Sequence, residues 1–334
     1  MGKITKELSK ELQEDIKRVG FLNIIAWLKD REIKIPSNAS NLFESLSELI
    51  EEKTLSIEQL KEAVAEIEEC GDKKILLFTA DEVEGLKANK TGVIKYLRTK
   101  FGISPSASNW VYGKPGDGPT FIYMYWDEDS IKIKYGERHY NFEFDPGTEK
   151  VEKIVRYVNI IIRIDTNTGL TELRLDNPGE KHQHKNDENK ITAAAYESFY
   201  VERMKALFKD INFSTFDLKP VAQYLAKKGK RIFRIIKDKS TITGGAKQTY
   251  ASPDTKTDVR DLVEFKGAAE KATATWRTDD LTGYWIADAS EKELTKDLFM
   301  RISRAQAHIR VQRGCLEQEL QYGIEQIRQI QEKV

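Results

Sequence analysis

The chain has 334 residues, of which 40% are hydrophobic and 32% charged, a balance typical of globular proteins and not of disordered ones. At roughly 100–200 residues per domain, this length predicts two or three domains. Its two cysteines, Cys70 and Cys315, are too few for a disulfide framework or a four-cysteine zinc site, which favours a reducing intracellular compartment such as the cytoplasm.

The formal net charge is zero, but the charge is distributed unevenly. Residues 201–250 carry 12 basic and 4 acidic side chains, whereas residues 1–75 carry 12 basic and 16 acidic ones. The first residues are charged and contain no apolar core, so no secretory signal is expected. Since no run of apolar residues reaches the length of a bilayer span, no membrane segment is predicted either.

The first hundred residues have the apolar spacing of helices. Asn41 and Ser56 each stand three residues before a Glu or Gln, which is the pattern of a capping box at the start of a helix. The predicted elements are one long helix over 6–29, helices over 41–52, 56–70 and 81–101, and a short strand over 74–78. Short connections between the helices favour antiparallel packing.

Residues 102–118 are rich in Ser, Pro and Gly and are predicted to form a linker or long loop. Beyond them the hydrophobic period changes from 3.6 to 2, which predicts an antiparallel meander of about five strands. The predicted strands are 120–126, 131–135, 140–144, 154–164 and 170–175, separated by turn residues at 127–129, 136–137, 145–147 and 167–169. A polar loop over 177–189 then leads to a helix over 190–210, which we expect to cover this sheet.

The last part of the chain mixes both periods. Its predicted elements are a helix over 216–228, strands over 231–236, 259–265, 272–276, 284–286, 298–303 and 307–311, and a helix over 316–332. The fold class is therefore α+β, with a helical domain over 1–101, a central antiparallel sheet with a covering helix over 102–212, and a mixed α+β domain over 213–334.

A dense group of basic residues is the strongest functional signal. The thirteen residues from 227 to 239 contain Lys227, Lys228, Lys230, Arg231, Arg234, Lys237 and Lys239, against one acid, Asp238. Lysines in the last turn of a helix also complement its dipole, which accounts for Lys227 and Lys228 without any ligand.

A second basic strip lies in the hairpin near the C-terminus. Residues 298–316 contain no acid, and strand alternation places Phe299, Arg301 and Arg310 on the outward side, with Arg313 following. Strands that present Arg and an aromatic ring can contact a phosphate backbone or stack on bases. The alternatives for both strips are an ordinary solvated surface and a site for an acidic protein.

One acidic pattern is similar to that of metal-dependent PD-(D/E)xK nucleases. Asp254 precedes an expected strand that carries Glu264 and Lys266. In such a site the two carboxylates would bind Mg²⁺ and the lysine would orient or deprotonate water. The pattern is degenerate, and an exposed strand with alternating charges is the favoured explanation.

Two further motifs are weaker. His182 and His184 could share a metal, but Lys181 and Lys185 flank them and favour a polar loop. The Gly-Gly-Ala-Lys run at 244–247 lacks the spacing of a phosphate loop and is typical of a hairpin tip.

We therefore interpret the chain as a non-enzymatic component of a larger intracellular assembly. It is predicted to bind DNA or RNA through the basic residues of its C-terminal half and a protein through its acidic N-terminal helices, with no cofactor. The alternatives are a Mg²⁺-dependent nuclease and a structural protein that self-associates into an oligomer.

Overall fold

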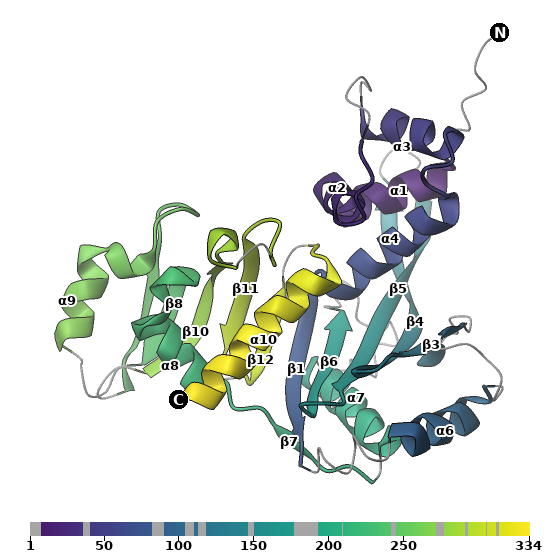
Figure 1. The fold of residues 1–334 in the computed structure, drawn as a ribbon. Coiled ribbons are helices and arrows are strands. Elements are labelled where there is room, and N and C mark those ends of the chain that lie inside the picture. The colour runs from purple at the N-terminus through teal and green to yellow at the C-terminus, as the bar shows by residue number, and fades with distance from the viewer. Residues whose placement is uncertain are drawn as a thin grey trace. The chain divides into compact units, whose positions relative to one another are not determined.

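The structure is a computed structural model. It describes residues 8–35, 41–81, 90–103, 110–112, 118–145, 150–176, 193–208, 210–241, 245–271, 277–290, 293–304, 306–311 and 314–334. The fold is mixed α+β with antiparallel strands, as the sequence predicts (Figure 1).

The chain divides into two compact units. The terminal unit combines Met1–Asp72 with Asp217–Val334, and the central unit comprises Lys73–Phe216. The sequence places its boundaries near 101 and 212, and whether those parts behave as independent domains stays a prediction.

The central unit contains one antiparallel sheet. Its strands are β1 (Lys73–Ala80), β2 (Trp110–Tyr112), β3 (Thr120–Trp126), β4 (Ser130–Asp145), β5 (Lys150–Asp165), β6 (Leu170–Asp176) and β7 (Phe213–Thr215). Within this unit the strand order is β2-β3-β4-β5-β6-β1-β7. Helices α6 (Lys90–Phe101) and α7 (Ala193–Leu207) supply Leu97, Tyr200 and Met204 to the core that buries Ile160 and Ile162 of β5.

Two sequence predictions for the central unit are wrong. Strand β4 runs through the predicted turn at Gly136, because its residues continue the ladder with the equally long β5. Part of the predicted linker, β2, pairs with β3. Residues 82–89 of the predicted 81–101 helix lie outside the described residues, and α6 begins at Lys90.

The terminal unit begins with four helices. They are α1 (Lys10–Val19), α2 (Phe21–Asp30), α3 (Leu42–Glu51) and α4 (Ile57–Cys70). The predicted caps are confirmed, since Asn41 Oδ1 accepts a hydrogen bond from the Glu44 N–H and Ser56 forms a capping box with Gln59. The single predicted helix over 6–29 is wrong, because Gly20 adopts a φ of 90° and separates α1 from α2.

The C-terminal part of this unit contains a further group of antiparallel strands, called here the C-terminal sheet, and its helices. The elements are α8 (Lys219–Lys227), β8 (Phe233–Thr241), β9 (Lys247–Ala251), α9 (Val263–Lys271), β10 (Arg277–Trp285), β11 (Leu298–Ser303), β12 (His308–Val311) and α10 (Glu317–Lys333). The strand order is β9-β8-β10-β11-β12, and α8 and α10 lie along one face (Figure 1). A Cβ atom at Gly323 of α10 would approach Met300, Leu298 and Trp285 to 2.9–3.2 Å, so the helix backbone lies directly on this covered face.

The predicted strand over 259–265 is wrong. Val259–Asp261 form a 3₁₀ turn, and α9 begins at Val263. The side chain of Asp258 accepts a hydrogen bond from the Arg260 N–H at 2.8 Å and thereby caps the turn. The predicted strand over 272–276 lies outside the described residues.

Among the described residues, no helix combines the length and the apolar character needed to cross a membrane.

Candidate nucleic-acid interface

The second face of the C-terminal sheet carries the basic residues, and we call it the basic face. Phe233 and Ile235 of β8 are buried in the core, whereas Lys237 and Lys239, which simple alternation would place on the same side, are exposed. A register shift between Thr282 and Gly283 of β10 accompanies this change of phase along β8. On β11, Leu298, Met300 and Ile302 are buried, and the residues between them belong to the basic face.

Strand register aligns the basic-face residues in three rows, because β10 lies between β8 and β11. The basic row crosses all five strands through Ala251, Lys237, Thr282, Arg301 and Arg310. The row beside it contains Thr249, Lys239, Asp280, Ser303 and His308, and we call it the acidic row after Asp280. The aromatic row on the other side contains Arg234, Tyr284 and Phe299. Part of each predicted basic strip, Lys237 of the first and Arg301 and Arg310 of the second, therefore lies on one face.

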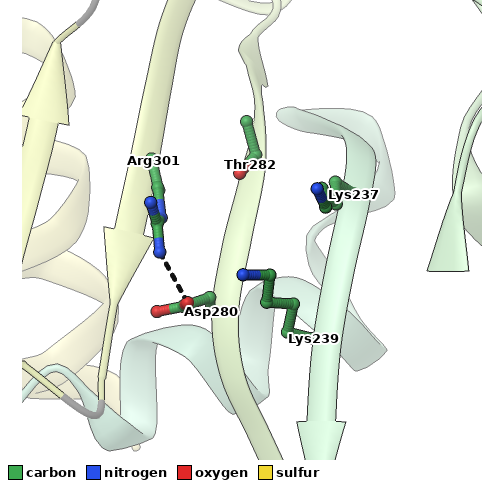
Figure 2. A pocket seen from close by; sticks show the side chains of 5 residues that line it. All are labelled: Lys237, Lys239, Asp280, Thr282 and Arg301. Atoms are coloured by element: carbon green, nitrogen blue, oxygen red, sulfur yellow. Dashed lines mark hydrogen bonds and ion pairs between the residues drawn. The ribbon is translucent and has the colours of Figure 1, made fainter. Parts of the chain in front are cut away.

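A pocket of about 210 Å³ lies where the basic and acidic rows meet (Figure 2). It is lined by Lys237, Lys239, Asp280, Thr282 and Arg301. Arg301 Nη2 lies 2.7 Å from Asp280 Oδ2, and the exposed fractions of the two side chains are 27% and 14%. Lys237 and Lys239 are exposed, and neither forms a hydrogen bond or a close ion pair with another side chain in the described part of the chain.

Asp280 is ionised in this environment. Burial alone would raise its pKa, but the neighbouring Ser303 hydroxyl, the hydrogen bond from Arg301 and the positive charges of Arg301 and Lys239 lower the pKa below its usual value. The pocket thus has three cationic side chains around one carboxylate and retains excess positive charge. A hydroxyl donor, Thr282, lies between Lys237 and Arg301 in the basic row.

Arg234 is positioned by two neighbours. It forms an ion pair with Asp297, and its Cζ atom lies 5.3 Å from the centroid of the Tyr284 ring. Tyr284 in turn makes an edge-to-face contact with Phe299, with ring centroids 5.0 Å apart. Arg234 is therefore partly neutralised, and its guanidinium forms part of the aromatic row.

The other predicted basic residues lie elsewhere or are not described. Lys227 and Lys228 end α8, and Lys230 and Arg231 belong to the following 3₁₀ turn, so these four belong to the elements beside the covered face. Lys230 Nζ also lies 2.5 Å from Asp261 Oδ1. Arg313 falls outside the described residues, as do His182 and His184.

Sequence reasoning missed several residues of the basic face. Lys247, considered as part of a hairpin tip, is an exposed residue of β9 that pairs with Thr241 on the same side as Lys239. Asp280, Thr282 and Tyr284 belong to the β10 segment that the sequence assigns only over 284–286. The alternation of apolar and polar residues in β10 is obscured by Gly283 and by two adjacent aspartates. Pairing with β8 and β11 is what identifies these residues as part of the basic face.

The residues of the nuclease alternative are placed differently from the expectation. Asp254 lies in an exposed loop, where the N–H groups of Thr257 and Lys256 lower the pKa of its carboxyl and satisfy one of its oxygens. Glu264 and Lys266 lie two residues apart in α9 and not in a strand. Side chains two residues apart diverge on a helix but share a face on a strand. The strand that the nuclease alternative requires for Glu264 and Lys266 is therefore wrong. Within the described residues no group of three or more His, Cys, Asp and Glu is arranged to hold a metal ion.

The N-terminal helices carry an apolar surface on α2. Phe21, Leu22 and Ile25 are 42%, 73% and 36% exposed. The protein partner predicted for these helices stays a prediction.

No protein-family model matches the sequence, and a search of curated proteins finds no match.

Proposed function

We propose that this chain binds nucleic acid through the basic face of its C-terminal sheet, by contacts to the phosphate backbone. The observation that supports the proposal most directly is the shared row of Lys237, Thr282, Arg301 and Arg310 across adjacent strands. Cations some sixty residues apart in the sequence thereby come together in one patch. Adjacent strands lie about 4.8 Å apart, so the row presents cations over the span of a few phosphates.

The composition of the patch fits phosphate better than it fits an acidic protein. Lys237 and Lys239 are exposed point charges, Arg301 presents a planar fork of donors, and Thr282 adds a hydroxyl within the same row. Contacts of this kind position a backbone without reading its sequence. Binding is therefore expected to be strong at low salt and similar for unrelated sequences.

The first prediction concerns salt dependence. If about four phosphates are neutralised, log K falls with log salt at a slope of about −3 to −4, and affinity drops about 100-fold between 50 and 200 mM salt. Replacing both exposed lysines (Lys237→Glu with Lys239→Glu) removes about two of these contacts and should flatten the slope by one to two units. Fluorescence anisotropy with a labelled oligonucleotide measures both quantities.

The matched control is Lys227→Glu with Lys228→Glu, which makes the same charge change at the end of α8. We expect this pair to leave the slope unchanged. The proposal fails if no DNA or RNA binds at 50 mM salt, or if the control pair flattens the slope as much as the test pair does.

A further inference from the structure

The aromatic row next to the basic row indicates what form of nucleic acid this face takes. Tyr284 and Phe299 lie two residues along their strands from Thr282 and Arg301, on the same face. Two residues along a strand span about 6.6 Å. A nucleotide whose phosphate lies on the basic row can therefore place its base over the aromatic row.

Phe299 is the member of this row that can meet a base. Its side chain is partly exposed, whereas Tyr284 is only 8% exposed and supports the Phe299 ring at 5.0 Å. Arg234 extends the row with a guanidinium that lies over Tyr284. Aromatic rings and guanidinium planes are the groups on which proteins stack unpaired bases.

The carboxylates within the patch also favour a ligand with unpaired bases. Asp280 lines the pocket, and Asp297 pairs with Arg234 at the end of the aromatic row. A carboxylate repels phosphate but accepts hydrogen bonds from the amino groups of bases. In a duplex one N–H of each such amino group is paired and the other lies in a groove between dense phosphates, whereas the whole base edge of an unpaired strand is free. A face that mixes cations, rings and carboxylates is therefore suited to a strand with unpaired bases.

We infer that the basic face binds single-stranded nucleic acid, with phosphates along the Lys237–Thr282–Arg301 row and a base stacked on Phe299. This inference rests on the phosphate-binding function proposed above and adds the class of ligand. DNA and RNA strands share the chemistry that is used here.

The experiment compares three labelled ligands with the full-length protein by fluorescence anisotropy: a mixed-sequence DNA 12-mer, the RNA strand of the same sequence, and the DNA duplex. We expect at least one single strand to bind about tenfold or more tightly than the duplex. Phe299→Leu keeps an apolar side chain of similar size and should weaken single-strand binding about tenfold, within the range of base–aromatic stacking. Because it removes no charge, it should leave the salt slope of the single strand unchanged.

The control is Phe199→Leu, which changes a 49% exposed phenylalanine on α7 and should leave all three affinities unchanged. A single 2-aminopurine in the DNA strand gives a second readout, since stacking on Phe299 should quench its emission in the unsubstituted protein and not in Phe299→Leu. Thermal melting verifies that both variants are folded.

The outcomes separate this inference from the function on which it rests. If the duplex binds as tightly as both single strands, or if Phe299→Leu changes neither affinity nor quenching, the inference is overturned while salt-dependent binding remains. If none of the three ligands binds, the proposed function fails with it. A preference for RNA over DNA supports the inference and indicates contacts to the 2′-hydroxyl.

Discussion

The cations of the basic face differ in how far a neighbouring carboxylate neutralises them. Arg301 forms an ion pair with Asp280 (Figure 2) and Arg234 with Asp297, whereas Lys237 and Lys239 are exposed and neither has a carboxylate of the described residues within ion-pair distance. A phosphate must compete with a carboxylate for each arginine but meets the lysines directly. The lysines should therefore contribute most to affinity, and the arginines more to geometry.

A buried carboxylate lies on the opposite side of β8. Asp238 has no exposed surface, its Oδ1 accepts a hydrogen bond from Ser240, and its Oδ2 has no partner among the described residues. Burial raises its pKa to about 6, opposed in part by Ser240 and helped by the nearby charge of Asp279.

Stability should therefore fall as the pH rises through the titration of Asp238. Its folded pKa of about 6 lies above the unfolded value of 3.8, so the folded state binds the proton more tightly. The penalty begins near pH 4 and is complete above pH 6. Two pKa units correspond to about 3 kcal/mol.

Asp238→Asn removes this ionisation. We expect the variant to be more stable than the unsubstituted protein at pH 7, by up to about 3 kcal/mol, with the difference vanishing near pH 4. Urea unfolding at a series of pH values measures it. A difference that is independent of pH would show that Asp238 does not titrate in this range.

At the scale of elements, one buried arginine ties together three segments of the terminal unit. Arg260 donates to the carbonyl oxygens of Leu225 in the last turn of α8 and of Phe233 at the start of β8. Asp258 holds the guanidinium from the other side and accepts a further bond from the Ile235 N–H. The pair is almost fully buried, at 9% and 6% exposed, and its hydrogen bonds join the segments that meet at this junction.

Arg260→Ala should destabilise the protein strongly, by about 3–5 kcal/mol, because it leaves the Asp258 carboxylate buried without its partner. The control is Lys266→Ala, which removes an exposed cation 4.0 Å from Asp261 and should cost less than about 1 kcal/mol. Chemical denaturation compares the two. Equal losses of unfolding free energy in the two variants would mean that the buried contacts of Arg260 contribute no more than an exposed ion pair does.

At this scale the sequence predicts elements that depend on local interactions better than elements that depend on distant ones. The caps at Asn41 and Ser56 are local, since each depends on a side chain and an N–H three residues away, and both were predicted. The strand assigned to 259–265 was wrong because short apolar runs fit strands and helices alike. What decides the outcome there is Arg260, whose partners at Leu225 and Phe233 are distant in the sequence.

The candidate site shows the same division. Alternation along β11 correctly predicted the sides of Phe299 and Arg301. It could not predict that β10 lies between β8 and β11, which is what joins the two basic strips, since strand order is a non-local property. Arg234 belongs to the predicted basic group, but its ion pair with Asp297 depends on a contact 63 residues away.

At the scale of the whole molecule, the terminal unit is built from the two ends of the chain. Leu316, just before α10, belongs to the core of the N-terminal helices. Cys70 at the end of α4 donates a hydrogen bond to Glu317 at 3.2 Å, and Asn23 accepts one from Lys296 at 2.6 Å. Because these contacts join the N-terminal helices to the C-terminal part of the unit, we expect the two to unfold together.

A cavity in the N-terminal helices should therefore weaken the distant basic face. Leu60 of α4 is fully buried, and Leu60→Ala should cost about 2–5 kcal/mol. Hydrogen exchange followed by mass spectrometry should show faster exchange in α4 and, by a similar factor, in β10 and β11, because all of them belong to one cooperative unit. The matched control is Leu173→Ala in β6, an equally buried leucine of the central unit, which should accelerate exchange in β5 and β6 and leave β10 and β11 protected. Acceleration confined to the four N-terminal helices in Leu60→Ala would instead mean that they fold as a separate domain.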